Sequence, residues 1–184
     1  MKILCLGDLY GEPGYQAVID RLPSIRQDLS LDFVLINAEN AADGHGLRPD
    51  QAEGLLAAGA DALTLGNHAW DHKPIRDYIW KQPALLRPLN FDPNAPGRGK
   101  ALIRTQAGKR VLVIQVQGKI FMRKVGTPYN YLRQGIEGFV LGREGEKGVD
   151  AILIDVHAEC ASEKLIAGHL MDGQVTAVFG THTH

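Results

Sequence analysis

Seven short apolar runs constrain the fold of this chain more than any other feature of its 184 residues. They are rich in Val, Ile and Leu, are bounded by Gly, Asp or Asn, and have the length of strands buried on both faces. Stretches with helical patterns lie between most of them. The predicted strands cover residues 2–7, 32–38, 61–66, 101–105, 110–117, 150–157 and 174–180. The predicted helices cover residues 13–28, 49–59, 73–82, 129–144 and 161–171.

Two of the runs are joined by a turn instead of a helix. Ala107 and Gly108 lie between the runs at 101–105 and 110–117, which predicts a β-hairpin. The alternation of strands and helices elsewhere indicates an α/β fold with a mixed sheet. Residues 88–99, PLNFDPNAPGRG, form a long irregular loop, for which a functional role and a plain surface excursion are both open.

Composition excludes several classes of protein. The chain has 45% hydrophobic and 22% charged residues, as in an ordinary single domain, and its net charge of −1 provides no general attraction to nucleic acid or anionic membranes. Cys5 and Cys160 form no disulfide framework, although one disulfide is possible in principle. The start MKILCLGD is charged too soon for a signal peptide, and no run approaches the ~18 apolar residues of a membrane helix. We therefore predict a cytoplasmic protein without a membrane partner.

Polar residues follow five of the apolar runs directly. In open α/β sheets, sites form beyond the carboxyl ends of the strands, so these residues are expected to meet at one edge. The candidates are Asp8, Glu39, Asn40, Asn67, His68, His157, His182 and His184. Each alone has a plainer interpretation, such as a cap, a tight turn with positive φ at a glycine, a structural histidine or a polar tail. Their matching positions at successive strand ends favour a metal site.

The residue types suggest which metals would bind. Side chains two residues apart in an extended segment point to the same side, so His182 and His184 can face one site. The carboxylate of Glu39 has two oxygens and can bridge two cations. Imidazoles with carboxylate and amide oxygens suit Fe, Mn, Zn or Co better than Ca or Mg. Seven candidate ligands exceed the needs of one tetrahedral zinc. They fit two metals ~3.5–4 Å apart, an arrangement used in phosphate-ester hydrolysis.

The motifs GD, GNH and GTHTH resemble those of the calcineurin-like metallophosphoesterases, whose pattern runs GDxH, GDxxD, GNHE or GNHD, an isolated His and GHxH. Tyr10 stands where that superfamily has a metal-binding histidine, and AEN replaces GDxxD. With these differences, GDLYGEPG, INAENAADGHG, LTLGNHAW, LRPLN, DVHAE and GTHTH resemble the YmdB family across the whole chain. That family is a cytoplasmic bacterial branch whose members hydrolyse 2′,3′-cyclic nucleotides. The resemblance implies an αββα sandwich of mixed β-sheets flanked by helices.

The resemblance also implies roles for the candidate residues. Two divalent or trivalent transition-metal ions, Fe or Mn with Zn as an alternative, would share Glu39. The first would be held by Asp8, Glu39, Asn40 and His184, and the second by Glu39, Asn67, His157 and His182. A hydroxide between the metals would attack phosphorus, Asn40 and His68 would bind the substrate, and His68 would protonate the leaving oxygen. Ala69 stands where the superfamily has the acid that orients this histidine; Asp71 is the nearest carboxylate, with a solvated helix-start residue as its alternative.

Outside the metal ligands the sequence leaves several alternatives open. Aromatic and sulfur side chains that could contact a base, or belong to the core, are Trp70, Phe121, Met122 and Tyr129. Arg87 or Lys119 could meet a phosphate or be solvated. A regulatory metal-binding domain and a phosphomonoesterase are the rival functions, and a homo-oligomer is open. Members of the resembled family continue beyond GTHTH, so we expect residues 1–184 to form one C-terminally incomplete domain without the closing strands.

Overall fold

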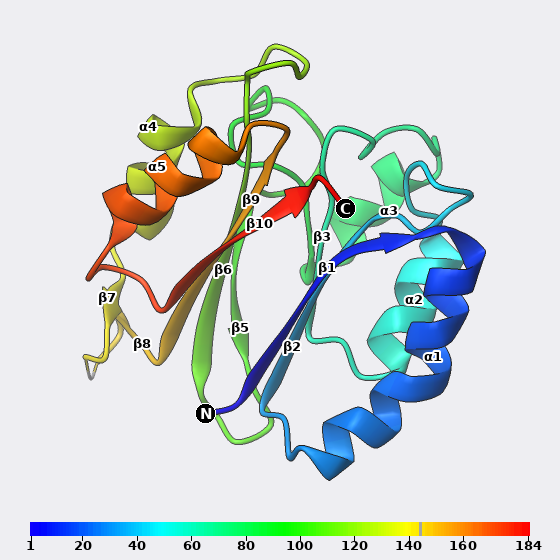
Figure 1. Ribbon diagram of the computed structural model, residues 1–184. Helices are drawn as coiled ribbons and strands as arrows, with labels where there is room; N and C mark the ends of the chain where they lie inside the picture. The colour runs from blue at the N-terminus through cyan, green and yellow to red at the C-terminus, as the bar shows by residue number, and fades with distance from the viewer. Residues whose placement is uncertain (144) are drawn as a thin grey trace.

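Two four-stranded β-sheets pack face to face in the computed structural model, which describes residues 1–143 and 145–184 (Figure 1). The first sheet is parallel throughout, and its strands follow the chain in order. Its strands are β1 (Ile3–Tyr10), β2 (Phe33–Asn40), β3 (Ala62–Thr64) and β4 (Leu85–Leu86). All four carboxyl ends therefore lie at the same edge of this sheet.

The second sheet has the order β10-β9-β6-β5. Its strands are β5 (Lys100–Arg104), β6 (Arg110–Gln117), β9 (Ala151–Ala158) and β10 (Ala177–His182). The predicted hairpin is confirmed, because β5 and β6 pair antiparallel, while β6, β9 and β10 are parallel to one another. This sheet is the mixed one.

Helices cover the outer face of each sheet, which confirms the predicted αββα sandwich (Figure 1). Three helices pack on the first sheet: α1 (Gly11–Asp28), α2 (Pro49–Ala57) and α3 (Ile75–Lys81). Two helices pack on the second sheet: α4 (Pro128–Ile136) and α5 (Ala161–Met171). None of the described helices is both long and apolar enough to cross a membrane.

The apolar runs are continuous because the central strands are buried on both faces. One face of each sheet packs on its helices, and the other faces contribute to a core between the sheets. The residues of this central core are Phe33, Leu35, Ala62, Leu86, Val111, Val113, Ala151 and Leu153. Cys5 and Cys160 are both free thiols, so they form no disulfide, and burial raises the pKa of Cys5 to about 11.

Some local predictions were wrong. The helix predicted over 129–144 ends at Ile136. Gly138 has a φ of 84°, which does not occur in a right-handed helix. Position 144 lies outside the described residues. The short strands β4, β7 (Val140–Leu141) and β8 (Gly148–Val149) were not predicted, since two residues carry no periodic pattern.

The loop at residues 88–99 is anchored by Arg87. This side chain is buried, and its guanidinium donates hydrogen bonds of 2.8 to 3.5 Å to four carbonyl oxygens of the loop, those of Pro88, Leu89, Ala95 and Pro96. The interpretation of Arg87 as a phosphate-binding residue is therefore wrong, because its donors are directed to the loop backbone.

We expect Arg87→Ala to lower the free energy of unfolding by about 2–3 kcal/mol, because the loop carbonyls lose a charged donor. Urea denaturation of the variant and the parent protein measures the difference. Arg133→Ala is the control, since this arginine is exposed on α4 and its loss should change stability by less than about 0.5 kcal/mol. An equally small change for Arg87→Ala contradicts the anchoring role.

Candidate metal centre

The predicted site residues come from the carboxyl ends of five strands in both sheets. β1 carries Asp8, β2 ends in Glu39 and Asn40, and the turn after β3 carries Asn67 and His68. The second sheet contributes His157 near the end of β9 and His182 at the end of β10. Because these strands are parallel within each sheet, the side chains are delivered to one edge of the sandwich.

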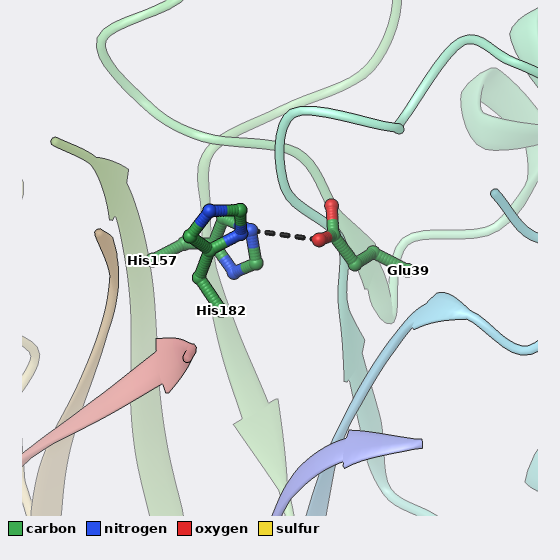
Figure 2. A group of neighbouring side chains, drawn as sticks. All are labelled: Glu39, His157 and His182. Atoms are coloured by element: carbon green, nitrogen blue, oxygen red, sulfur yellow. Dashed lines mark ion pairs between the residues drawn. The ribbon is translucent and has the colours of Figure 1, made fainter. Parts of the chain in front are cut away.

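The four residues assigned to the second metal lie together. Glu39, His157 and His182 each offer a ligand atom within 4.8 Å of the others, and they face one another in Figure 2. His157 Nε2 lies 2.7 Å from Glu39 Oε1 and 3.0 Å from Asn67 Oδ1. Glu39 and His157 are fully buried, whereas His182 is half-buried and also pairs with Glu159 at 3.0 Å. Glu159 was not predicted to contact this cluster.

The residues assigned to the first metal are less tightly gathered. Asp8 Oδ2 accepts a hydrogen bond of 2.6 Å from the backbone N–H of His182. Asp8, Tyr10, His182 and His184 line one groove. His184 is exposed, its ring contacts Tyr10 with centroids 5.2 Å apart, and it is not part of the cluster of Glu39, His157 and His182. The extended geometry expected between the two last histidines is broken, because His182 has a φ of 90°.

Two of the predicted ligands have buried oxygen atoms without a hydrogen-bond partner. These atoms are Asp8 Oδ1 and Asn40 Oδ1, and no described residue donates a hydrogen bond to them. A buried acceptor without a donor costs about 1–3 kcal/mol, so such atoms require a compensating group. A cation would compensate both, and the carboxylate, amide and imidazole donors suit a transition metal. The residues present therefore fit a metal centre.

A chain of hydrogen bonds behind His157 determines which ring nitrogen can bind a metal. Thr181 Oγ1 donates to Asp155 Oδ1 at 2.6 Å and lies 2.8 Å from His157 Nδ1. Since the hydroxyl hydrogen is directed to Asp155, Thr181 accepts from His157, and Nδ1 carries the proton. The lone pair of a neutral His157 is then on Nε2, which faces Glu39 and Asn67.

Asp155 lies at the centre of a buried polar network that sequence reasoning missed. Its Oδ2 accepts hydrogen bonds from Thr64 at 2.7 Å, Asn37 at 2.9 Å and Gln115 at 3.1 Å, so the network joins both sheets. Burial raises the pKa of Asp155, although nearby His157 and these hydrogen bonds oppose the shift. The available signal was a carboxylate inside the apolar run at 150–157, two residues before His157 and thus on the same strand face.

Glu39 and His157 favour each other's charged forms in the absence of metal. Burial acts to raise the pKa of Glu39, yet its ion pair with His157 and the backbone N–H of His68 lower this pKa overall. Burial acts to lower the pKa of His157, yet the carboxylates of Glu39, Asp155 and Asp8 raise it overall. Their ion pair of 2.7 Å holds both side chains beside each other.

Gly66 is required by close packing and not by its backbone conformation. Its φ is not in the left-handed region, so the turn interpretation with positive φ is wrong. A Cβ at this position would clash with Glu39 Oε2 and with the His157 ring. Glycine thus lets two candidate metal ligands approach the turn after β3.

We expect Gly66→Ala to weaken metal binding by about 10- to 100-fold, the usual loss when groups that position ligands are disturbed. Isothermal titration with Mn²⁺ measures the affinity. Gly168→Ala is a matched control, since nothing lies within 4 Å of a Cβ added there on α5. Unchanged affinity in Gly66→Ala would show that the ligands do not depend on this close approach.

His68 lies beside the cluster and is oriented by Asp71. His68 Nδ1 is 2.7 Å from Asp71 Oδ2. Asp71 is therefore the acid that orients His68, and not a solvated residue at the start of a helix. The backbone N–H of His68 donates to Glu39 Oε2 at 3.1 Å, and the ring of His45 meets His68 edge-on with centroids 4.7 Å apart. His68 Nε2 is not used by Asp71 and stays available for a ligand.

The side chains considered for base or phosphate binding separate into different environments. Trp70 lines a cavity next to Asn67. Phe121 is 88% exposed, Tyr129 packs against the core of the second sheet, and the sulfur of Met122 accepts a hydrogen bond from the Glu159 backbone at 3.3 Å. Lys119 is exposed.

Comparisons with known proteins agree with this architecture. A family model described as YmdB-like protein matches residues 4–184. The 2′,3′-cyclic-nucleotide 2′-phosphodiesterase of Bacillus subtilis (strain 168) is 41% identical over 184 residues, which is 100% of this chain and 67% of that protein. The crystal structure of a hypothetical protein from Thermus thermophilus has a TM-score of 0.88 and 40% identity over 100% of this chain and 68% of its own.

A second solved structure, a novel phosphatase from Mycoplasma pneumoniae, has a TM-score of 0.86 and 32% identity over 100% of this chain and 64% of its own. The 184-residue chain thus spans about two thirds of the length of these relatives, between 64% and 68%.

Proposed function

The chain belongs to the family of YmdB-like proteins, and on this premise we propose that it is a metal-dependent phosphodiesterase acting on 2′,3′-cyclic nucleotides. Two observations carry the proposal: the buried, unpartnered oxygens of Asp8 and Asn40, and the cluster of Glu39, His157 and His182. The substrate class follows the name of the Bacillus subtilis relative.

We assign two transition-metal ions to this edge, iron or manganese with zinc as the alternative. Asp8, Glu39, Asn40 and His184 would hold the first, and Glu39, Asn67, His157 and His182 the second. When bound, such ions activate water and neutralise charge on the phosphate. The tight group around Glu39 supports the second set more directly, because its ligand atoms lie within 4.8 Å of one another. For the first set, the support is that Asp8 and His184 line one groove.

His68 would act as the proton donor to the leaving oxygen. Its Nδ1 is paired with Asp71, so the ring orientation is restrained and Nε2 can carry the transferred proton. Asn40, at the end of β2, would direct its amide toward a non-bridging phosphate oxygen.

A turnover panel on the purified 184-residue chain tests the proposal, with elemental analysis of the same sample. The substrates are 2′,3′-cyclic AMP, bis-p-nitrophenyl phosphate and p-nitrophenyl phosphate, each with added Mn²⁺. Hydrolysis of both diesters with two metals per chain supports the proposal. Faster hydrolysis of the monoester favours a phosphomonoesterase, and bound metal without any turnover favours a regulatory metal-binding domain. The cytoplasmic location and a homo-oligomer stay predictions.

A further inference from the structure

A cavity of about 450 Å³ opens directly beside the metal centre. It lies between the turn after β3, the loop at 88–99 and the segment that follows β6. Asn67 lines this cavity and is also 3.0 Å from His157 Nε2. A ligand with its phosphate at the metal centre can therefore place its other end in the cavity.

The walls of this cavity are aromatic. Trp70, Phe91 and Tyr131 line it, and all three are half-buried. The rings of Trp70 and Phe91 have centroids 6.3 Å apart and are tilted by 56°. Arg76, which does not line the cavity, lies 5.6 Å from the Trp70 ring centroid and helps to hold the indole in place. Flat aromatic walls next to a phosphate site suit the stacking of a base.

Gln117 provides a buried polar atom without a hydrogen-bond partner at this cavity. It is fully buried, lines the cavity at the end of β6, and pairs in register with His157 on β9. Its Nε2 donates to the Arg123 carbonyl at 3.3 Å, whereas its Oε1 has no hydrogen-bond partner among the described residues. A buried acceptor of this kind is satisfied by an N–H donor, and nucleobases carry such donors on their edges.

The cavity is already shaped before a ligand binds. Asn90 Nδ2 donates to the carbonyl oxygens of Gln117 at 2.7 Å and Gly126 at 2.8 Å, and its Oδ1 accepts from the Gln117 N–H at 2.8 Å. This buried side chain ties the loop at 88–99 to β6 and to the opposite wall. Preformed cavities with a few convergent polar groups are the usual form of small-molecule sites.

We propose that this cavity binds the nucleobase of the cyclic nucleotide, with Trp70 as the stacking surface and Gln117 Oε1 as the acceptor for a base N–H. The inference rests on the proposed function for its substrate class. It adds a source of selectivity for nucleotides over other phosphodiesters, which the metal ligands do not provide.

Tryptophan fluorescence tests base binding without metal and without turnover. The chain has two tryptophans, Trp70 in the cavity and Trp80, which is 60% exposed on α3. In Trp80→Phe the indole of Trp70 is the sole emitter, and we expect adenosine to quench it with saturation, while ribose does not. In Trp70→Phe, adenosine should leave the emission of Trp80 unchanged. Equal responses of the two variants, or no quenching by millimolar adenosine, overturn the proposal.

Kinetics then link the cavity to substrate choice. We compare kcat/KM for 2′,3′-cyclic AMP with kcat/KM for glycerol 1,2-cyclic phosphate, which has no base to stack. We expect Trp70→Ala to lower the ratio of the two by about 5- to 150-fold, through an increase in KM for 2′,3′-cyclic AMP. Trp70→Phe should lose less of this kcat/KM ratio than Trp70→Ala, because a ring remains. Trp80→Ala should leave kcat/KM unchanged for both substrates.

An unchanged ratio in Trp70→Ala overturns the base subsite while leaving the phosphodiesterase assignment intact. If the parent chain hydrolyses neither diester, the proposed function fails, and the fluorescence titration still decides whether a base binds beside Trp70.

Discussion

Glu39→Gln is expected to lose metal from both sites at once and to lose phosphodiesterase activity by at least about 10³-fold, since bound metals contribute several kcal/mol to such reactions. Glutamine has nearly the same shape but no charge, and only one of its two terminal atoms is an acceptor. It cannot bridge two cations, and its amide hydrogens would compete with them near His157. Elemental analysis after dialysis and the 2′,3′-cyclic AMP assay measure the two losses.

Glu163→Gln is a matched control for this substitution. Glu163 is also buried, but it accepts hydrogen bonds from the backbone N–H groups of Lys119 and Ile120 and is not part of the cluster of Glu39, His157 and His182. Its variant should retain both metals even if the protein is less stable. Two tightly bound metals in Glu39→Gln would contradict the bridging role of Glu39.

His68→Ala is expected to lower kcat by about 10²- to 10⁴-fold while the metal content stays near that of the parent protein. The reason is that His68 is directed by Asp71 and contributes only a backbone N–H to Glu39, so its side chain is not needed to hold a cation. Steady-state kinetics and elemental analysis on the same preparation separate catalysis from metal binding.

Two further variants define the role of His68. Asp71→Asn should lower kcat by less than His68→Ala, because the imidazole remains and loses only its orienting carboxylate. His169→Ala should have no effect on kcat, since His169 is exposed on α5. Loss of metal from His68→Ala would instead make His68 a ligand and leave the proton donor unassigned.

The strand ends were predictable because the signals are local in sequence. Runs such as DFVLINA and DAILIDVH are mostly apolar because strands buried on both faces contact mainly apolar groups on each side. A polar residue directly after such a run lies at the carboxyl end of its strand, and parallel pairing brings those ends to one edge. Glu39, Asn67, His157 and His182 were found in this way.

Other contacts were not predictable because their partners are distant in the chain or depend on side-chain direction. Asn37 and Thr64 of the first sheet meet Asp155 of the second only when the two sheets pack face to face. The cavity beside Asn67 likewise requires Asn90 to tie the loop at 88–99 to the end of β6. The sequence did not decide whether Asp71 orients His68 or is solvated, because three residues of separation in a turn do not specify where a side chain points.

The sequence by itself determined the number and order of the main strands and which residues follow them, because burial on both faces and strand length leave a one-dimensional pattern. Only the tertiary structure decided how these residues meet: Gly66 leaves room for Glu39 and His157, and the ring of His184 contacts Tyr10. These outcomes depend on distances between atoms of separate strands, and no pattern along a single chain records such distances.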